Sequence, residues 1–459
     1  MANALTHKRV LQIAIPIVLS NATVPILGVV DTGVVGQLGQ SAPIGAVGIG
    51  AIILTAFYWI FGFLRMGTAG LTAQATGAGD DAEVAALLSR ALLIGFAAGT
   101  VMIVGQIPLF WLAFKVSPAS AEVESLARTY MGIRVWSAPA TIALYGIIGW
   151  LIAQERTRGV FAIQVLMNGL NIALDILFVL HFDFGVAGVG WATFIAEWGG
   201  LAFGLWLCRD AFAMGAWRDK ARVFDMPRLK RMAVMNTDIL IRSVLLQAIF
   251  VSFLFWGADF GDVQLATNQI LLQFLNVTAY ALDGFAAAAE SLVGQALGAK
   301  NAARLRRGAI LTSGWGTAIC AGLALLFALA GPSIIDIMTT APEVQTTARH
   351  YLPYMVAAPI VGVASWMFDG IFIGATRTRD MRNMMVVSAI VSLKGWSASK
   401  FAAPHDQSLV EHAALFEVGD QCRRSLIDQL GGFHNPVLDS AVMIPPAVIE
   451  LDESHATLG

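Results

Sequence analysis

The residues of this chain that could do chemistry are ionisable side chains inside long apolar stretches. Asp31 lies in VPILGVVDTGVVGQLG, and Asp175 lies in NGLNIALDILF. Asn171 and Asn168 precede Asp175 at helical spacing, so all three lie on one side of a helix. A charge inside lipid is costly and therefore marks a functional candidate. These carboxylates and amides could share a proton or bind Na⁺ through oxygen atoms, although a polar network that only packs helices would use the same residue types.

Further charges stand within apolar stretches. Asp283 lies in TAYALDGFAAAAE and Asp369 in SWMFDGIFIGATRTRD. Asp238 stands one helical turn before Arg242, so these two side chains could simply pair. For all three aspartates a functional and a structural role are open. Pairing with acidic groups is the commoner use of an arginine within a span, as at Arg65 and Arg134.

Two prolines interrupt the first apolar stretch, which also carries Asp31. Pro16 and Pro25 each remove a helix hydrogen bond and permit a kink. A helix that bends beside a carboxylate would couple the binding of a cation to a change of shape. A static kink would have no such effect, and the sequence favours neither.

The sequence lacks the motifs of nucleotide binding, of zinc proteases and of serine hydrolases. Lys300 in GQALGAKN lacks the glycine spacing and the following Ser or Thr of a Walker A loop, so direct use of ATP is not expected. There is no His-Glu-x-x-His and no Gly-x-Ser-x-Gly motif. We therefore expect no enzyme, no cofactor and no firm metal site, apart from Na⁺ at Asp31 and Asp175. A net charge of −2 gives no sign of a nucleic-acid partner.

The elements that must position these residues are membrane-spanning helices. Hydrophobic residues make up 57% of the chain and charged residues only 13%, whereas a soluble domain carries about 25% charged residues. We predict an all-α polytopic membrane protein in a lipid bilayer. Ten apolar stretches are long enough to span it, with approximate limits 10–38, 45–76, 88–113, 123–152, 157–181, 185–208, 229–257, 262–298, 305–331 and 345–374.

The Lys and Arg residues predict the orientation in the membrane. With a cytoplasmic N-terminus, the cytoplasmic segments hold nineteen Lys and Arg residues, and the outer loops hold only Lys115, Arg128 and Arg349. We expect the inner (plasma) membrane of a bacterium. The basic runs at 156–158 and 376–379 are most simply anchors on the cytoplasmic side.

The chain repeats itself at an offset of 221 residues. Gln74 and Gly77 in LTAQATGAGD match Gln295 and Gly298 in LVGQALGAKN, and 295 − 74 = 221. The segment GWLIAQERTRG, from residue 149, matches GIFIGATRTRD, from residue 370, at the same offset. Duplicated halves are common in membrane transporters. We therefore predict two pseudo-repeated helical bundles, 1–210 and 229–391, joined by a cytoplasmic linker at 211–228.

The repeat predicts more spans than the sequence supplies. Segment 392–459 is polar, with four basic and nine acidic residues and a net charge of 4 − 9 = −5. The eleventh helix should begin near Arg382 and lose its apolar pattern near Val391, and no twelfth follows. The second bundle would then hold four helices and the start of a fifth. The tail is expected to be disordered or to derive from a frameshift.

Several long motifs occur in the order found in a known family. The segments IPIVLSNATVPILGVVDTGVVGQLG, NGLNIALDILF, AYALDGFAAAAESLVGQALGA and FDGIFIGATRTRDMRNMMVVSA resemble the DinF-type branch of the multidrug and toxic compound extrusion (MATE) transporters, over about residues 8–390. The resemblance implies two six-helix bundles around a cavity, and export of organic cations and amphipathic drugs in exchange for H⁺ or Na⁺. It also implies that Thr193 joins the network of Asp31, Asn171 and Asp175. The second-bundle cation site of other members corresponds to Asp369 and, less closely, to Asp238.

The leading hypothesis is a monomeric secondary antiporter of small molecules that works by alternating access. Asp31 and Asp175 would bind the coupling cation. Asn171 and Thr193 would orient these carboxylates. The alternatives are an inactive truncated or frameshifted product, a flippase of the same architecture for lipid-linked substrates, and a membrane enzyme, which the lack of a catalytic constellation disfavours.

Overall fold

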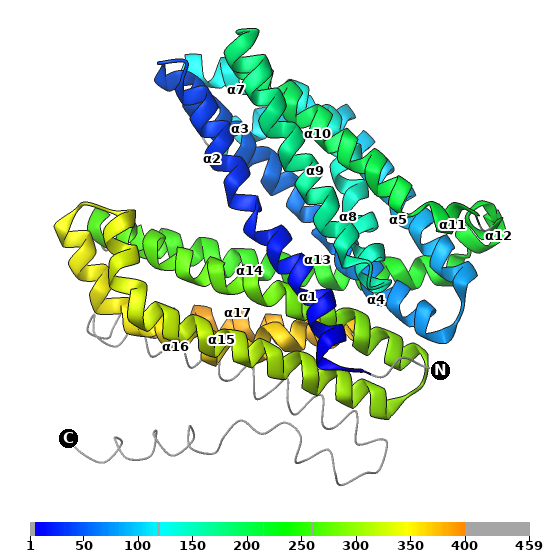
Figure 1. Ribbon diagram of the computed structural model, residues 1–459. Helices are drawn as coiled ribbons and strands as arrows, with labels where there is room; N and C mark the ends of the chain where they lie inside the picture. Colours follow the sequence, from blue (N-terminus) through cyan, green and yellow to red (C-terminus); the bar gives the residue numbers. More distant parts are fainter. Residues whose placement is uncertain (1–4, 117–119, 214, 259–260, 400–459) are drawn as a thin grey trace, which may run out of the picture. The chain divides into compact units, whose positions relative to one another are not determined.

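The computed structural model describes residues 5–116, 120–213, 215–258 and 261–399, in which it contains helices and no strand (Figure 1). Nine helical segments of this part are long and apolar enough to cross a membrane. They correspond to the second to tenth predicted spans, so the prediction of an all-α polytopic membrane protein is confirmed. Their limits are Ser41–Ala78, Asp81–Val104, Ala121–Ala153, Thr157–His181, Gly185–Leu207, Lys220–Ser252, Asp262–Gly298, Ala302–Met338 and Pro342–Gly374.

The first half contains α1 (His7–Ala22), α2 (Val24–Gly36), α3 (Ser41–Trp59), α4 (Phe63–Ala78), α5 (Asp81–Val104), α6 (Gln106–Val116), α7 (Ala121–Arg134), α8 (Ala138–Ala153), α9 (Thr157–Asp175) and α10 (Gly185–Leu207). Two short helices, α11 (Arg209–Ala213) and α12 (Lys220–Val223), lie in the linker. The second half contains α13 (Met226–Ala258), α14 (Asp262–Gly298), α15 (Ala302–Met338), α16 (Pro342–Gly374) and α17 (Thr378–Ser399). Single 3₁₀ turns join α3 to α4 and α7 to α8, so each of these pairs forms one span.

The first predicted span, 10–38, is broken into α1 and α2. The break falls at Thr23, whose N–H and hydroxyl both donate to the Ser20 carbonyl oxygen, at 3.1 and 2.7 Å. Pro25 accounts for it, because proline has no N–H to continue the helix and disfavours a helical residue before it. Pro16, in contrast, lies inside a continuous α1, so the helix does not end there, and the kink at Pro16 stays a prediction. A helix can tolerate the loss of one hydrogen bond by bending.

The repeat extends to the turns between helices. Gly79 and Lys300 follow equivalent helices, 300 − 79 = 221, and both have positive φ, 72° and 53°. The next residues, Asp80 and Asn301, are the N-caps of α5 and α15, and each side chain accepts a backbone N–H at 3.0 Å. Such caps satisfy N–H groups that have no partner within the helix. The same local chemistry therefore begins α5 and α15.

The matched glycines lie where α4 and α14 cross. A Cβ atom on Gly77 would lie 2.0 Å from the Gln295 carbonyl oxygen, and one on Gly298 would lie 2.0 Å from the Gln74 carbonyl oxygen. Each half thus places its glycine against the glutamine backbone of the other half. Only glycine permits so close an approach of two backbones.

The glutamine side chains cross in the same way. The Gln74 amide donates to the Gly374 carbonyl oxygen at 3.1 Å, and the Gln295 amide donates to the Ala153 carbonyl oxygen at 2.9 Å. Because 295 − 74 and 374 − 153 both equal 221, the two bonds are equivalent in the repeat. We call Gln74 and Gln295 the glutamine pair. The repeated sequence therefore builds a pseudo-symmetric joint between the halves.

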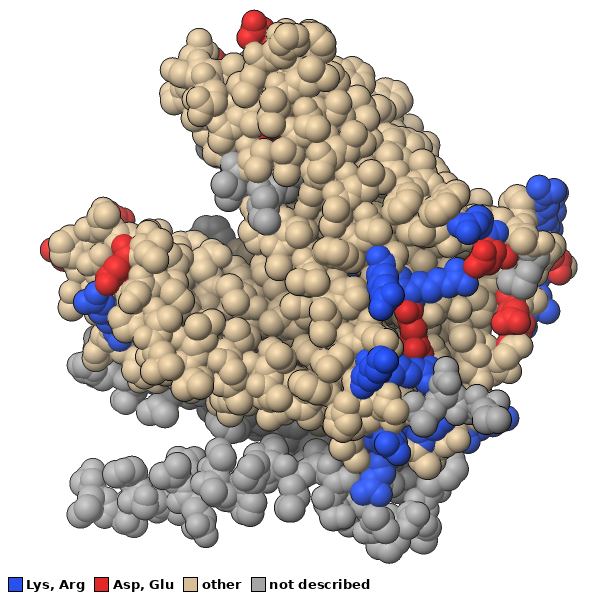
Figure 2. All heavy atoms as spheres, viewed as in Figure 1, with Lys and Arg blue, Asp and Glu red and all other residues tan. Residues whose placement is uncertain are grey.

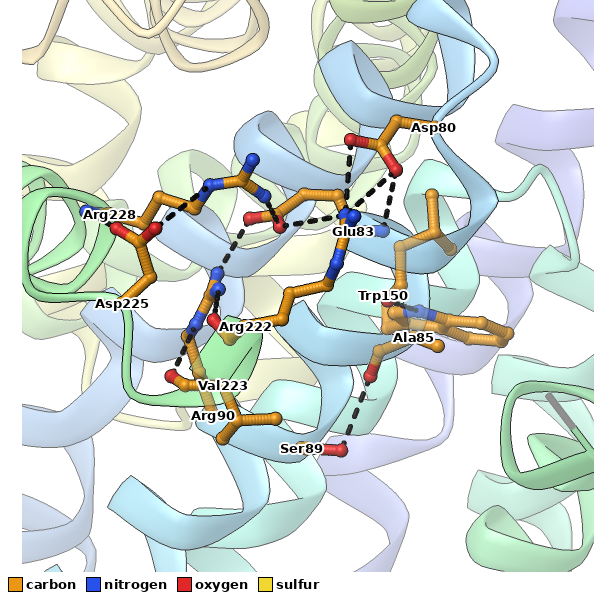
Figure 3. A network of polar contacts seen from close by, with 11 residues as sticks. Asp80, Glu83, Ala85, Ser89, Arg90, Trp150, Arg222, Val223, Asp225 and Arg228 are labelled. Atoms are coloured by element: carbon orange, nitrogen blue, oxygen red, sulfur yellow. Dashed lines mark hydrogen bonds and ion pairs between the residues drawn. The ribbon is translucent and has the colours of Figure 1, made fainter. Parts of the chain in front are cut away.

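The linker is fixed to α5 by a polar network (Figure 3). The buried guanidinium of Arg90 donates to the carbonyl oxygens of Arg222 and Val223, at 2.6 and 2.9 Å, and to the Glu83 carboxylate at 2.6 Å. Arg228 also donates to Glu83. The sequence predicted only a linker at 211–228. The structure adds that one buried arginine donates to two carbonyl groups of the linker and so attaches it to α5.

The charged side chains are unevenly distributed. Figure 2 shows a group of Lys and Arg side chains at one end of the described part of the chain and few charges over most of the visible face. Lipid hydrocarbon cannot solvate charges, so an uncharged belt with charged margins is expected of a protein in a bilayer.

The described residues divide into two units, with the boundary between Asn383 and Met384. The eleventh predicted helix is α17, which begins at Thr378 rather than Arg382 and continues to Ser399, past Val391. Helical hydrogen bonds are local, so a helix can extend beyond the end of an apolar pattern. Residues 400–459 of the predicted tail, where a twelfth helix would stand, lie outside the described residues. The bundle boundaries near 210, 228 and 391 stay predictions.

We expect Gly77→Ala to lower the unfolding temperature of the purified protein in detergent, because the added methyl group must displace the Gln295 backbone. Overpacking of this kind typically costs about 1–3 kcal/mol. Gly314→Ala in α15 is the matched control, since nothing lies within 4 Å of its Cβ position and alanine favours a helix over glycine by about 1 kcal/mol. Equal unfolding temperatures of the two variants would contradict the close crossing.

Candidate functional site

Asn171 joins the two buried carboxylates of the first half. With the amide oriented so that its nitrogen faces them, this nitrogen lies 3.1 Å from Asp31 Oδ1 and 3.1 Å from Asp175 Oδ2. The amide oxygen then accepts from the Thr193 hydroxyl, also at 3.1 Å. All four side chains are buried, and Asp31, the most accessible, is 8% exposed. The structure therefore brings together four of the five site residues predicted in the first half.

Three helices supply these side chains. Asp31 lies on α2, Asn171 and Asp175 stand one turn apart at the end of α9, and Thr193 lies on α10. A π-helix, Ile176–His181, follows directly after Asp175. Such segments interrupt the regular hydrogen-bond ladder and are frequent at functional sites. Asp175 Oδ1 has no hydrogen-bond partner among the described residues.

Asn168, the fifth predicted residue, lies beside the network and contacts the helix break. Its amide nitrogen donates to the Thr23 carbonyl oxygen at 3.3 Å, and its oxygen accepts from Gln164 at 2.9 Å. The helical spacing predicted that it shares a side of α9 with Asn171 and Asp175, and this side contacts the break between α1 and α2. It supports the junction between α1 and α2, one turn before Asn171.

A buried ion pair lies one turn along α10 from Thr193. Arg134, at the end of α7, contacts Glu197 at 2.8 Å and donates to the Tyr130 hydroxyl at 2.8 Å. The pairing expected for Arg134 is thus present, but sequence analysis missed Glu197. The available signal was that Glu197 is the single acidic residue of the predicted span 185–208. Glu197 Oε2 lacks a hydrogen-bond partner among the described residues.

The second half holds a larger group of charges. Asp369 of α16 contacts Arg242 of α13 at 2.6 Å. Asp283 of α14 lies 3.5 Å from Arg65, which also lies 3.8 Å from Glu290. Because Arg65 belongs to α4, this group joins the second half to the first. Among the residues that the structure describes, Asp283 and Asp369 each form an ion pair, whereas Asp31 and Asp175 form none.

Asn21 links the end of α1 to the second-half group. Its amide donates to Asp283 Oδ2 at 3.0 Å and to the Tyr280 carbonyl oxygen at 3.3 Å. Asn21 stands two residues before Thr23, whose carbonyl oxygen accepts from Asn168. The break between α1 and α2 is thus held by α14 of the second half and by α9 of the first.

Asp238 and Arg242, whose spacing allowed a local pair, have other partners in the structure. Arg382 donates to Asp238 Oδ1 at 2.6 Å, and the Thr378 hydroxyl donates to Oδ2 at 3.1 Å. Arg242 pairs with Asp369 instead. Spacing of one turn allows a pair but does not prevent a closer partner on another helix. Asp238 therefore lies outside the charge group around Asp369.

The described residues contain no group of three or more His, Cys, Asp or Glu side chains that could hold a metal ion. The candidate site of the first half consists of two carboxylates, an amide and a hydroxyl. Such oxygen ligands suit a proton or a hard cation.

Comparison with known proteins identifies the family. A family model described as MatE matches residues 16–177 and 239–394. This chain belongs to the MatE family. DNA damage-inducible protein F of Escherichia coli (strain K12) is 37% identical over 388 residues, which cover 84% of each chain. A probable multidrug resistance protein NorM of Rhodopseudomonas palustris is 26% identical over 377 residues, covering 79% of this chain and 77% of that one.

The fold of this chain also matches that of solved MATE structures. A crystal structure of MATE in the bent conformation superposes with a TM-score of 0.83 at 18% identity, covering 93% of this chain and 96% of that one. MatE members are membrane transporters rather than enzymes and need no cofactor. The resemblance to MATE transporters and the role of a multi-pass membrane transporter are therefore confirmed. The MatE match contains Asp31, Asn171 and Asp175 but leaves out 178–238, where Thr193 and Glu197 lie.

We expect Arg134→Met to lower the unfolding temperature strongly, because it leaves the Glu197 charge buried without its partner. Removing one member of a buried ion pair typically costs about 3–5 kcal/mol. The double variant Arg134→Met/Glu197→Met should recover most of this loss, since no charge remains to be solvated. Thermal unfolding in detergent measures both variants. A double variant no more stable than the single one would show that the uncompensated charge is not the cause.

Proposed function

We propose that this MatE protein is a secondary antiporter that exports organic cations and other amphipathic compounds in exchange for H⁺ or Na⁺. The observation that carries this proposal is the Asn171 amide between the carboxylates of Asp31 and Asp175. Two ionised carboxylates that share one amide in a buried site repel each other strongly. A bound proton or Na⁺ would offset this repulsion, so the site is suited to taking up a cation.

The helix break offers a route from cation binding to a change of shape. Asp31 lies on α2, whereas α1 is tied to α14 through Asn21. A cation on the carboxylates would alter the hydrogen bonds that Asn171 donates. Helix α2 could then shift against α9 at Thr23 while α1 keeps its contacts. A ligand moves such an equilibrium only by its difference in affinity for the two states, so cation and drug would favour different states.

The relatives support the substrate class. The relative from Rhodopseudomonas palustris is named a probable multidrug resistance protein. We propose that the present chain likewise exports amphipathic drugs, as a monomer in the inner membrane with its N-terminus in the cytoplasm. The group of Lys and Arg at one end of the described residues supports this orientation (Figure 2).

The role of Asp31 is tested by Asp31→Asn in the purified full chain in proteoliposomes. We expect ethidium transport driven by an imposed pH or Na⁺ gradient to be lost, because one of the two carboxylates is gone. Comparing the two gradients for the unaltered protein identifies the coupling ion. Asp336→Asn is the matched control, since Asp336 forms an exposed pair with Arg349 at 2.5 Å and such pairs contribute little. Full gradient-driven transport by Asp31→Asn would overturn the proposal.

We expect Asn171→Leu to lower gradient-driven ethidium transport while leaving the amount of inserted protein unchanged. Hydrogen bonds to charged groups contribute about 1.5–3 kcal/mol, which corresponds to a loss of roughly 10- to 100-fold. Asn276→Leu in α14 is the control, because the Asn276 amide is exposed and bonds only to Gln273, at 3.4 Å, within the described chain. Similar transport rates for both variants would argue against the bridging role of the Asn171 amide.

A further inference from the structure

A basic pocket lies where α13 begins and where α16 connects to α17. Its volume is about 490 Å³. The polar and charged residues that line it include Lys230, Arg231, Thr376, Arg377, Thr378 and Arg379. All of them belong to the unit Met1–Asn383. The pocket shares no residue with the carboxylate site of the first half.

The cationic side chains of this pocket lack acidic partners. None of the four forms an ion pair with a residue that the structure describes, and all four are exposed. They are Lys230, Arg231, Arg377 and Arg379. Of the two acids at the pocket, Asp238 already accepts from Arg382 and Thr378. Only Asp380 then remains to oppose four positive charges.

In the first half, the arginines that correspond to those of the pocket are neutralised by acidic side chains of the same half. Arg9 contacts the Glu155 carboxylate at 2.5 Å, whereas Arg231 contacts the Thr376 hydroxyl at 3.4 Å, and 376 − 155 = 221. Each arginine also contacts the member of the glutamine pair from the opposite half, at 3.3 Å in both cases. The two arginines therefore make matching contacts, although 231 − 9 = 222 and the residue at the repeat offset from Arg9 is Lys230. A neutral threonine stands in the second half where the first half has a carboxylate.

A second pair of equivalent arginines differs in the same way. Arg156 contacts Asp210 at 2.8 Å. Its counterpart is Arg377, since 377 − 156 = 221, and Arg377 has no ion pair within the described residues. At two matched positions, the first half supplies its own anion and the described second half does not. The pocket thus carries positive charge that the acidic side chains of the described residues do not balance. This is the charge expected of a site that binds an anion from elsewhere.

We infer that this pocket binds a phosphate group, carried by an anionic lipid headgroup or by free phosphate. Guanidinium groups match the oxygen atoms of a phosphate with paired hydrogen bonds. The Thr376 hydroxyl accepts from Gln74 and Arg231, which leaves its own proton for a phosphate oxygen. The first N–H groups of α17 lack partners within the helix and favour a nearby anion. Basic pockets between helix ends are suited to lipid headgroups.

This inference is independent of the proposed antiport. Lys and Arg that only set the orientation of a membrane protein need not line a common pocket, because water solvates them. The arrangement of four cations around one cavity, with a hydroxyl and a helix start, is a specific geometry that a phosphate group fits.

The substitution Thr376→Glu gives the second half the carboxylate that Glu155 supplies in the first half. Thr376 has φ 54° and Glu155 has φ 57°, so the backbone at this position accepts a glutamate. The new carboxylate would pair with Arg231 and repel a phosphate. We expect the dissociation constant for phosphatidylglycerol, measured by native mass spectrometry on the full chain in detergent, to rise by about tenfold or more. Thr376→Gln, of equal size without the charge, should change it by less than about threefold.

A second comparison removes the pocket cations. We expect Arg231→Gln/Arg377→Gln to weaken phosphatidylglycerol binding by about tenfold or more, because two phosphate partners are lost. Lys300→Gln/Arg307→Gln is the matched control, since both side chains are exposed in the same half and do not line the pocket. It removes the same charge and should have little effect.

Inorganic phosphate distinguishes the two sources of the ligand. If phosphate alone raises the unfolding temperature above that in chloride, and Thr376→Glu abolishes the shift, free phosphate suffices as ligand. If only phosphatidylglycerol binds with this dependence on Thr376, the ligand is a lipid headgroup. Both outcomes support the inference. Equal phosphatidylglycerol binding by all variants would indicate diffuse attraction to a basic surface and would overturn it, as would the absence of binding by either probe.

Discussion

Charged side chains inside the spans have no water to solvate them, and much of this structure follows from how they find partners. Arg134 pairs with Glu197 within the first half, and Arg242 pairs with Asp369 within the second. Arg65 extends from the first half to acids of the second. An uncompensated buried charge costs several kcal/mol. Each pair therefore fixes the relative position of the helices that carry it.

The carboxylates of Asp31 and Asp175 stand apart from these pairs because an amide, not a cation, lies between them. An amide satisfies hydrogen bonds but leaves the negative charge uncompensated. The helix break at Thr23 lies on the same chain segment as Asp31 and is held by residues of both halves. Asp31 thus lies on the part of the first span that follows the helix break. This combination makes the first half the better candidate for the coupling site.

The duplication supplies a symmetric scaffold on which the chemistry is asymmetric. The glycine contacts and the glutamine pair are equivalent in the two halves and form the joint between α4 and α14. The charged groups do not follow this symmetry. At one pair of equivalent turns, Glu155 neutralises Arg9, whereas Thr376 leaves Arg231 with neutral acceptors only among the described residues. Backbone packing constrains both copies alike, whereas a surface charge can change in one copy without disturbing the joint.

The sequence by itself determined nine of the spans, the repeat and the shared helix face of Asn171 and Asp175, because these follow from apolar length, a fixed offset and helical spacing along the chain. The contact of Asp31 with these two residues was implied only by the resemblance to MATE transporters. The same spacing rule placed Asn171 and Asp175 correctly but also allowed a pair of Asp238 with Arg242 that the structure does not contain. Spacing states which residues share a helix face, but not which helix that face meets. Tertiary structure decided the ion-pair partners, the bond from Asn168 to the helix break and the basic pocket, because those contacts join residues far apart in the chain.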